Sequence, residues 1–297
     1  GEACSGSRMI DDDLVTLVGS FSDLAPLHNA PNLTGIREMR RALGDTPQVA
    51  VFDTAFHQTI PEYAYRYALP DALYREHRIR RYGFHGTSHR YVAERARELL
   101  GVAQDATDLI TCHLGNGCSI TAVKGGRSVD TSMGFTPLEG VMMGTRTGSF
   151  DPAVLLYLAA KGFTTDALDR MVNKESGLLG ISGVSNDVRD LEDAAADGNA
   201  RAKLALEMFA YQVRKTIGAY LAVLGGCRAI VLTGGIGENA AAMRARILDG
   251  LDGLGIALDA GRNTSEAAGE RDIATDDSPV RILVVPTDEE RAIAEET

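Results

Sequence analysis

The stretch Ala229-Ile-Val-Leu-Thr-Gly-Gly-Ile-Gly-Glu-Asn239 decides the fold of this 297-residue chain. Its apolar half is too short for a helix and predicts a strand that is buried on both faces. The glycines permit a tight turn, and a helix is expected from about Asn239 to Leu251, with its free N–H groups directed at that turn. Such a turn suits a nucleotide or another anion, but the same glycines can simply pack a strand against a helix.

The composition indicates a globular, acidic protein with room for two domains. Hydrophobic residues make up 44% and charged residues 24%, as in ordinary globular proteins. The net charge of −11 disfavours a nucleic-acid partner, because such surfaces cluster Lys and Arg. No apolar run approaches the ~20 residues that span a membrane. The four cysteines form no CxxC pair, which favours a reducing cytoplasm over a disulfide framework.

The first fifty residues predict a short helix near Leu14 to Phe21, a loop over residues 24–32 that is shaped by two prolines and two asparagines, and a strand over residues 48–52. Asp53 follows the carboxyl end of that strand, where open α/β sheets bind their ligands. An aspartate at this point is a functional candidate, and it is equally typical of a turn or a helix N-cap.

Residues 80–89 contain two histidines before a predicted helix over residues 88–100, which Thr87 or Ser88 would cap and Gly101 would end. His85 and His89 are four residues apart, a spacing that can hold zinc. The glutamate of the HExxH motif is absent, however, and His85 precedes the helix. We therefore expect His85, between two glycines, to reach an anion, and His89 to be a structural, hydrogen-bonded residue.

Residues 109–133 predict a β-meander whose first turn, Gly115-Asn-Gly117, is able to direct backbone N–H groups at a phosphate. An ordinary Asn-Gly hairpin would look the same. The long loop over residues 134–149 follows, and loops of this length inside compact domains are usually functional. Arg146 in this loop can offer a guanidinium to phosphate or carboxylate, or can pair with an acid at the surface.

The second half predicts a helix after Asp151-Pro152, a short helix over residues 165–173, a glycine-rich loop over residues 177–189 and a long helix from about Ala200 to Leu224. A short strand is expected over residues 255–258, an acidic loop over 260–279 and a last strand over 281–285. Thr287 and Glu290 would form the capping box of a final helix. Glu289 suits the positive end of that helix, or a metal at a nucleotide site.

Eight segments in this order resemble the acetate kinase family, within the superfamily of acetate and sugar kinases, Hsc70 and actin. Each segment is modest alone, but the ordered set is highly specific and covers nearly the whole chain. The segments are Leu27-His-Asn, Val51-Phe-Asp-Thr-Ala-Phe-His57, Tyr82-Gly-Phe-His-Gly-Thr-Ser-His89, His113-Leu-Gly-Asn-Gly117, Gly144-Thr-Arg146, Asp187-Val-Arg189, Gly235-Ile-Gly-Glu-Asn239 and Pro286-Thr-Asp-Glu-Glu290.

The resemblance implies an α/β fold of duplicated actin-like (ribonuclease H-like) domains, each a mixed sheet with helices on both faces. Residues 55–285 would form the C-terminal, nucleotide-binding domain. Residues 1–54 and 286–297 would be a remnant of the N-terminal domain, on the side of the catalytic acid and the metal. The implied reaction is ATP + acetate ⇌ ADP + acetyl phosphate, by direct in-line transfer with Mg²⁺, which Mn²⁺ can replace. The family also implies a homodimer, with the helix at 200–224 as one candidate surface.

The resemblance also assigns roles to individual residues. Asp53 would be the catalytic acid, with His85 and Arg146 stabilising charge on the transferring phosphoryl group. The remaining roles divide by substrate: the ATP phosphates at His113, Leu114, Gly115, Asn116 and Gly117; the nucleoside at Asp187, Val188, Arg189, Gly235, Ile236, Gly237, Glu238 and Asn239; the acetate methyl at Leu27, Phe84 and Pro137; and the Mg²⁺ ion at Glu289.

The front of the sequence departs from the family. The family's Ser-rich Asn-x-Gly-Ser-Ser-Ser-x-Lys loop and its His-Arg-Val-Val-His-Gly segment do not occur in these 297 residues. We therefore expect this chain to be a fragment and to be inactive by itself. Two alternative functions stay open: a propionate or butyrate kinase, and a non-catalytic nucleotide-binding module of the actin or chaperone kind. Asp53, His85 and Arg146 argue against the second, because binding alone does not require them.

Overall fold

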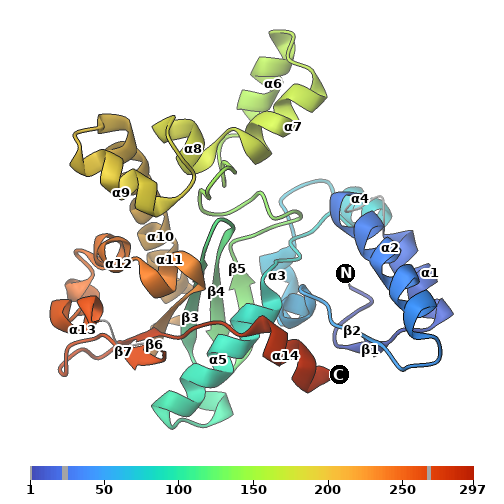
Figure 1. Ribbon diagram of the computed structural model, residues 1–297, viewed down its shortest axis with the longest axis horizontal. Helices are drawn as coiled ribbons and strands as arrows, with labels where there is room; N and C mark the ends of the chain where they lie inside the picture. The colour runs from blue at the N-terminus through green and yellow to red at the C-terminus, as the bar shows by residue number, and fades with distance from the viewer. Residues whose placement is uncertain (1, 22–25, 266–268) are drawn as a thin grey trace.

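The computed structural model describes residues 2–21, 26–265 and 269–297, without the side chains of residues 26–30 (Figure 1). Its centre is a six-stranded mixed sheet in the order β5-β4-β3-β6-β8-β7, in which β6 is parallel to both β3 and β8 and the other pairs are antiparallel. This confirms the predicted mixed sheet. The strands are β3 (Leu109–Leu114), β4 (Cys118–Lys124), β5 (Arg127–Thr131), β6 (Ala229–Thr233), β7 (Arg271–Asp272) and β8 (Arg281–Val284).

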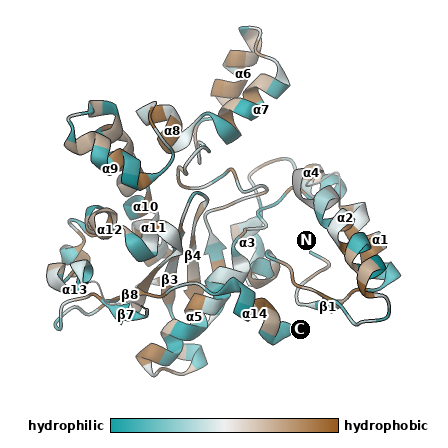
Figure 2. Ribbon diagram, in the orientation of Figure 1, coloured by the Kyte–Doolittle hydropathy of each residue, from teal (hydrophilic) through white to brown (hydrophobic). Residues whose placement is uncertain are grey.

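The central strand β6 is buried along its whole length, as its continuous apolar sequence predicts. Alternate side chains of a strand face opposite sides of the sheet. Ile230 and Leu232 join the large core under helix α10 (Ala200–Leu224), whereas Ala229 and Val231 join a smaller core under helix α5 (Gly86–Leu100). Helices therefore cover both faces of the sheet, as predicted, and Figure 2 shows its strands as the apolar centre of the molecule.

Helix α10 has the predicted bounds because both of its ends are encoded locally. Asn199 accepts the N–H groups of Arg201 and Ala202, and Gly225 ends the helix in the left-handed conformation at φ 76°. The remaining helices of the sheet-containing body are α6 (Ala153–Ala160), α7 (Thr165–Lys174), α8 (Gly177–Ser182), α9 (Val188–Ala196), α11 (Gly234–Asn239), α12 (Ala241–Leu248), α13 (Ala260–Thr264) and α14 (Glu289–Glu296), with single 3₁₀ turns at Gln104–Ala106 and Asp252–Leu254.

The N-terminal part, residues 2–52, lies to one side of the sheet (Figure 1). Its two short strands, β1 (Arg8–Met9) and β2 (Val49–Ala50), pair antiparallel, and helices α1 (Asp12–Ser20) and α2 (Pro26–Leu43) pack on each other. A linking segment then leads to α5 through a 3₁₀ helix η1 (Ala55–Thr59) and helices α3 (Glu62–Tyr65) and α4 (Asp71–His77).

Two predictions for this part were wrong. The loop expected over residues 24–32 is helical from Pro26 onward, where the structure describes it, and Pro31 lies inside the helix. Packing of Leu33 into the N-terminal core outweighs the hydrogen bond that Pro31 is unable to donate. The strand expected over residues 48–52 is reduced to the two residues of β2, because only Arg8 and Met9 pair with it.

Other errors concern segments that are rich in glycine. The loop expected over residues 177–189 contains helix α8 and the start of α9, and the helix expected from Asn239 begins at Gly234 as α11 and continues as α12. Helix α10 contacts α8, α9 and α12. Burial of α8 against this long helix, and packing of α11 against β3 and β6, outweigh the low helix propensity of glycine, which is about 1 kcal/mol per residue.

Smaller differences lie at element ends. Helix α5 begins at Gly86 after His85, so Thr87 and Ser88 are inside it rather than capping it. Asp288, not Thr287, caps α14 by accepting the N–H of Arg291. The strand expected over residues 255–258 is a single bridge from Leu258 to Ala274, β5 ends at Thr131, and the acidic loop over 260–279 contains α13 and β7. Among the residues that the structure describes, no helix combines the length and apolar character needed to cross a bilayer.

Candidate active site

A cleft of about 640 Å³ lies beyond the carboxyl ends of β3 and β6. It brings together three segments that are far apart in the sequence and that were each predicted to bind nucleotide. The predicted residues that line it are Gly115, Asn116, Asp187, Val188, Arg189, Gly235, Ile236 and Asn239. This volume is in the range of small-molecule and cofactor sites, and the position is the one at which open α/β sheets bind their ligands.

The parallel pairing of β3 with β6 explains why these turns meet. His113 pairs with Thr233, so both strands end at the same level and release their turns side by side. Gly234 lies in the left-handed region at φ 75°, and a Cβ on it would come within 2.8 Å of the Leu114 carbonyl oxygen. Only glycine therefore allows the β6 turn to pass this close to the end of β3.

Five residues predicted to bind nucleotide do not line this cleft: His113, Leu114, Gly117, Gly237 and Glu238. The side chain of Leu114 is buried in the core. The Glu238 carboxylate accepts the N–H of Gly234 at 2.8 Å and the N–H of Thr287 at 3.2 Å. It thereby ties the β6 turn to the start of α14, and its geometry is that of a structural bridge.

His85, His113 and Arg146 gather at the Gly115–Gly117 turn. The imidazole rings of His85 and His113 stack with their centroids 4.3 Å apart. A Cβ on Gly117 would lie 3.4 Å from both His85 Nε2 and Arg146 Nη2, and a Cβ on Gly115 would lie 3.9 Å from His113 Nε2. Three potential hydrogen-bond donors thus face one turn beside the cleft, which suits an anion such as a phosphoryl group.

Burial controls the charge of these groups. It lowers the pKa of His85 to about 4, with the Arg146 charge as a second cause, and lowers the pKa of His113 to about 3, with His85 as a second cause. Both rings are therefore neutral at neutral pH. Burial also lowers the pKa of Arg146, but a guanidinium keeps its charge.

Arg146 is held by neutral groups. Its Nη1 donates to the Pro137 carbonyl oxygen at 2.8 Å, and no carboxylate pairs with it among the described parts of the chain. The alternative of an arginine paired with an acid at the surface is thus not observed. An unpaired, half-buried cation at this position retains its full capacity for an anionic ligand.

Asp53 lies against the turn that carries His85. Its Oδ2 accepts the N–H of His85 at 2.7 Å, and its carbonyl oxygen accepts the N–H of Gly86 at 2.8 Å. His85 adopts the left-handed conformation at φ 57°. Asp53 is therefore not a helix N-cap, since Thr54 holds that position in η1 and His85 in α5; it bonds instead to the backbone at the start of α5, where the helix end favours a negative charge.

Glu289 in the first turn of α14 faces Asp53 closely enough for the two charges to interact. Burial, with the Asp53 charge as a second cause, raises the pKa of Glu289. In the described ranges no three His, Cys, Asp or Glu side chains form a metal cluster, so the zinc alternative for His85 and His89 finds no support. Two carboxylates do fit Mg²⁺, which takes one or two protein carboxylates and otherwise water and phosphate oxygens.

The structure describes two of the three residues predicted to surround the acetate methyl group. Phe84 is half-buried and packs against the large core, next to His85 in sequence. Pro137 is half-buried and holds Arg146 through its carbonyl oxygen. The side chain of Leu27 lies outside the described residues. His89 is fully buried and hydrogen-bonded to Thr111 and Ser119, which confirms its predicted structural role.

Sequence reasoning missed several polar residues at the site. Asn186 lines the cleft and donates to Asn116 Oδ1 at 2.8 Å, and Glu192 lies nearby on α9. Ser88 and Ser119 bond to the two stacked histidines. Asn186 adjoins Asp187 and Ser88 lies within the motif at 82–89, so position next to a motif was the available signal. Nothing in the sequence marked Ser119 or Glu192.

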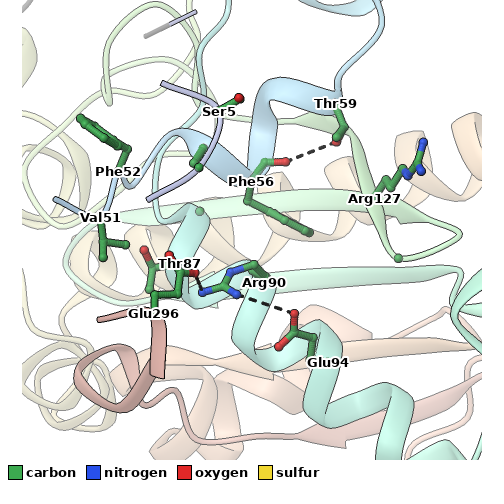
Figure 3. Close-up of a pocket in the computed structure, with 14 residues that line it drawn as sticks. Ser5, Val51, Phe52, Phe56, Thr59, Thr87, Arg90, Glu94, Arg127 and Glu296 are labelled. Atoms are coloured by element: carbon green, nitrogen blue, oxygen red, sulfur yellow. Dashed lines mark hydrogen bonds and ion pairs between the residues drawn. The ribbon is translucent and has the colours of Figure 1, made fainter. Parts of the chain in front are cut away.

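A second cavity, of about 280 Å³, lies between the N-terminal part, η1, α5 and the end of α14 (Figure 3). Figure 3 shows Arg90 at its centre, paired with both Glu94 and Glu296. The motif at 51–57 contributes Val51, Phe52, Ala55 and Phe56 to its lining and the motif at 82–89 contributes Gly86 and Thr87, but none of the predicted site residues lines it. Arg90 is paired with two carboxylates, and the other arginine of the lining, Arg127, is exposed.

Comparison with known proteins identifies relatives over the whole chain. Residues 1–295 match the acetokinase family. The acetate kinase of Methanosarcina thermophila is 57% identical over 298 aligned residues, covering 100% of this chain and 73% of that protein. The structure of Porphyromonas gingivalis acetate kinase matches with a TM-score of 0.96 at 48% identity, covering 100% of this chain and 75% of that one. A propionate kinase structure from Francisella tularensis matches with a TM-score of 0.95 at 46% identity, covering 100% and 76%.

These likenesses confirm the predicted actin-like α/β fold class and an enzyme of the phosphotransferase kind. The eight motifs were thus a sound basis for assignment, since the match extends over nearly all residues and not only over the motifs. The chain belongs to the acetokinase family.

Proposed function

We propose that this chain carries the site for reversible phosphoryl transfer between ATP and acetate, giving ADP and acetyl phosphate by direct in-line transfer. One observation supports this most: Gly115 and Asn116 line the nucleotide-sized cleft, while the next residue, Gly117, faces His85 and Arg146. A nucleotide bound in the cleft with its phosphates along this turn would bring its terminal phosphoryl group to these two donors.

Each residue has a defined part in this proposal. Asp187–Arg189, Gly235, Ile236 and Asn239 bind the nucleoside end, and His113–Gly117 bind the phosphates. His85 Nε2 and Arg146 Nη2 donate to the oxygens of the transferring group, whose charge is spread over them in the transition state. Removal of one such donor typically costs about 3 kcal/mol of transition-state stabilisation.

Asp53 and Glu289 form the acidic side of the proposed site. They would hold Mg²⁺, or Mn²⁺ in its place, and a bound Mg²⁺ supplies charge neutralisation between the phosphates and the acceptor. Asp53 also fixes the backbone of His85 and so orients the imidazole. In this proposal residues 55–285 are the nucleotide-binding domain, and residues 1–54 with 286–297 belong to the domain of the catalytic acid.

The acceptor is proposed to be acetate, with its methyl group against Phe84 and Pro137. Such an apolar pocket distinguishes acyl groups weakly, by about 1–3 kcal/mol per methylene. Propionate and butyrate are therefore alternative acceptors, and the similarity to a propionate kinase favours propionate of the two. A non-catalytic nucleotide-binding module stays a weaker alternative, because it leaves the unpaired Arg146 without a purpose.

We further propose a cytoplasmic homodimer without nucleic-acid or membrane partners. Four free cysteines suit a reducing compartment. Leu156 and Tyr157 on α6 are 74% and 61% exposed, and Figure 2 shows α6 as an apolar helix on a projecting hairpin. Tyr211 on α10 is 63% exposed as well. Apolar surface of this kind is typical of subunit contacts, and sedimentation analysis measures the oligomeric state directly.

Nucleotide binding is tested by filling the cleft. Gly235 lines the cleft, does not need a positive φ and has no atom within 4 Å of a Cβ added to it. Gly235→Phe should therefore leave the backbone intact and reduce ADP affinity more than tenfold in calorimetric titration. Gly253→Phe is the matched control, because Gly253 has the same freedom outside the cleft. Equal ADP affinity in both variants would contradict the proposed nucleotide site.

Transfer is tested at Arg146. In a chain extended by the family's Ser-rich loop and His-Arg-Val-Val-His-Gly segment, Arg146→Ala should lower the rate of acetyl phosphate formation about 100- to 1000-fold while ADP affinity changes little. Arg41→Ala is the control, because Arg41 is an exposed arginine that pairs with Glu38 on α2. Rates with acetate, propionate and butyrate identify the acceptor. The wild-type rate also checks the prediction that residues 1–297 alone are inactive, for which ADP binding without turnover is the expected result.

A further inference from the structure

The two stacked imidazoles have a common hydrogen-bond arrangement. His85 Nδ1 lies 2.8 Å from Ser119 Oγ, and His113 Nδ1 lies 2.8 Å from Ser88 Oγ. In both rings the other nitrogen, Nε2, faces the Gly115–Gly117 turn. Each serine therefore contacts the nitrogen that points away from the proposed phosphate position.

The position of the proton on each ring decides what Nε2 is able to do. A neutral imidazole carries one N–H and one bare nitrogen. A ring with its proton on Nε2 donates a hydrogen bond to an anion at the turn. A ring with its proton on Nδ1 presents a lone pair there and repels the same anion.

A short buried chain of hydrogen bonds continues from His85. Ser119 Oγ lies 2.8 Å from His85 Nδ1 and 2.7 Å from His89 Nε2, and His89 Nδ1 lies 2.7 Å from Thr111 Oγ1. Ser119, His89 and Thr111 are all fully buried. Burial also keeps the pKa of His89 well below its usual value, so this ring is neutral too.

Three proton arrangements satisfy every contact in this chain. One has Ser119 accept from both His85 Nδ1 and His89 Nε2; it leaves the fully buried Ser119 proton without an acceptor in the described part of the chain and is strongly disfavoured, so two remain. In the first, Thr111 donates to His89 Nδ1, His89 Nε2 donates to Ser119, and Ser119 donates to His85 Nδ1, which leaves the His85 proton on Nε2. In the second, every bond is reversed: His85 Nδ1 donates to Ser119, Ser119 donates to His89 Nε2, and His89 Nδ1 donates to Thr111.

The hydroxyl of Thr111 distinguishes the two arrangements. In the second, its proton needs another acceptor, and the described part of the chain offers the Thr111 hydroxyl no hydrogen-bond partner other than His89. An unpaired donor in a fully buried position is strongly disfavoured. The first arrangement leaves no buried proton unpaired.

We propose that Ser119, supported by His89 and Thr111, is a positioning residue that fixes His85 with its proton on Nε2, so that His85 presents an N–H to the phosphoryl group. The assignment of the phosphoryl group as the acceptor rests on the proposed function, whereas the tautomer itself follows from the buried hydrogen bonds. His113 provides a comparison within the same protein, because its hydrogen bonds run through Ser88 to Thr287, which is only half-buried.

The tautomer is measured directly by long-range ¹H–¹⁵N spectra of the protein labelled with ¹⁵N-histidine, at neutral pH. Protonated and bare imidazole nitrogens resonate far apart, so each ring reports its proton position. His85→Gln identifies the His85 signals by their loss. The expected wild-type pattern is a protonated Nε2 and a bare Nδ1 in His85. A proton on Nδ1 would overturn the proposal.

The role of Ser119 is tested by substitution. Ser119→Ala should shift the His85 nitrogen signals toward the average of the two tautomers, and Ser119→Thr, which keeps the hydroxyl, should restore a single tautomer. Ser278→Ala is the matched control, since Ser278 is a buried serine whose hydroxyl donates to the Val280 carbonyl oxygen. An unchanged His85 pattern in Ser119→Ala would refute the positioning role.

A second variant covers the case in which Ser119→Ala fails to fold. Thr111→Val keeps the shape of the side chain and removes the hydroxyl that distinguishes the two arrangements, so His85 should again report a mixture. A single tautomer in that variant would refute the chain of bonds. ADP titration of the wild-type protein separates the two proposals: a fixed tautomer without ADP binding leaves this inference standing and removes the proposed function.

Discussion

The N-terminal part and the sheet-containing body differ in how much apolar surface each buries. The N-terminal core consists of Cys4, Leu14, Val18 and Leu33. The core of the body extends over both faces of a six-stranded sheet and along helix α10. Since the hydrophobic contribution grows with buried apolar area, the body should supply most of the stability, and the N-terminal part should follow it.

The candidate site reflects the same division. Asp53 follows the N-terminal part in sequence, yet the hydrogen bonds of its carboxylate and carbonyl oxygens go to His85 and Gly86, at the start of α5 in the body. The body therefore fixes the proposed catalytic acid. Stability and site geometry therefore both depend on the body more than on the N-terminal part.

The largest effect is expected in the core of the body. Phe209 on α10 is fully buried, and Phe209→Ala should lower the free energy of unfolding by about 3–5 kcal/mol. Leu14→Ala in the N-terminal core should cost about 2 kcal/mol, because a small core relaxes around the lost side chain. Urea denaturation measures both. Equal losses in the free energy of unfolding would show that both cores contribute equally to a single cooperative unfolding transition.

The next effect depends on pH and on buried histidine. Burial lowers the pKa of His57 to about 4, and this ring bonds to Ser128 and to the Phe84 carbonyl oxygen. The unfolded chain, with a histidine pKa near 6.5, binds the proton more readily. The stability that neutral His57 contributes to the fold is therefore fully present above the histidine pKa of the unfolded chain, and it is lost as the pH falls toward 4. At about pH 5 the loss is about 2 kcal/mol.

His57→Gln removes this titration. Denaturation of the wild-type protein and of the variant, each at about pH 7 and pH 5, should show a smaller acid-dependent loss in the variant. Because His57 packs against Gly83 in the body, the effect should appear in the main unfolding transition. An identical loss in the two proteins would show that other groups control the acid sensitivity.

Substitutions at two helix caps should have a smaller effect on stability, and they form a closely matched pair. Asn199 caps α10 in the body and Asp11 caps α1 in the N-terminal part, each through its side-chain oxygen. Substitution of either by alanine should cost about 1 kcal/mol locally. The full cost should appear in global unfolding only for Asn199→Ala, and the N-terminal part should show its loss as faster amide exchange. If Asp11→Ala lowered the free energy of global unfolding and Asn199→Ala only accelerated local amide exchange, the body would not be the more stable part.

The smallest effect is expected at an exposed ion pair of the N-terminal part. Arg40 bonds to Asp12 at 2.8 Å, and the Asp12 side chain is 91% exposed. Arg40→Gln should change the free energy of unfolding by less than about 0.5 kcal/mol, because water screens such pairs. A loss above about 1 kcal/mol in urea denaturation would show that electrostatics, rather than the four-residue core, joins α1 to α2.

The sequence predicted those elements whose signals are local. Strand β6 has a continuous apolar run, and α10 has its cap at Asn199 and its end at Gly225. The errors at α2, α8 and α11 have one physical cause. Proline and glycine disfavour helix by their own propensities, but packing against other helices, or against strand β3 in the case of α11, outweighs those propensities.

The same distinction applies to the site. Motif order predicted that residues near Asn116, Asp187 and Gly235 would meet, and the cleft confirms that meeting. The direction of each side chain was not predictable, because it depends on contacts between distant segments. Glu238 bonds to Thr287 rather than lining the cleft, and Ser119 on strand β4 reaches His85 and His89 at the start of α5. The proposed roles of the individual site residues stay predictions.

The strand order also governs how this chain folds as it is synthesised. The hairpins of β3, β4 and β5 are complete once Thr131 has left the ribosome, but the other edge of β3 has no partner until Ala229–Thr233 follows. Throughout that interval an apolar strand exposes an unpaired edge, which is a template for association with other chains. Completion of the sheet is therefore a late, long-range step and the interval of greatest aggregation risk, in which a chaperone has most to protect.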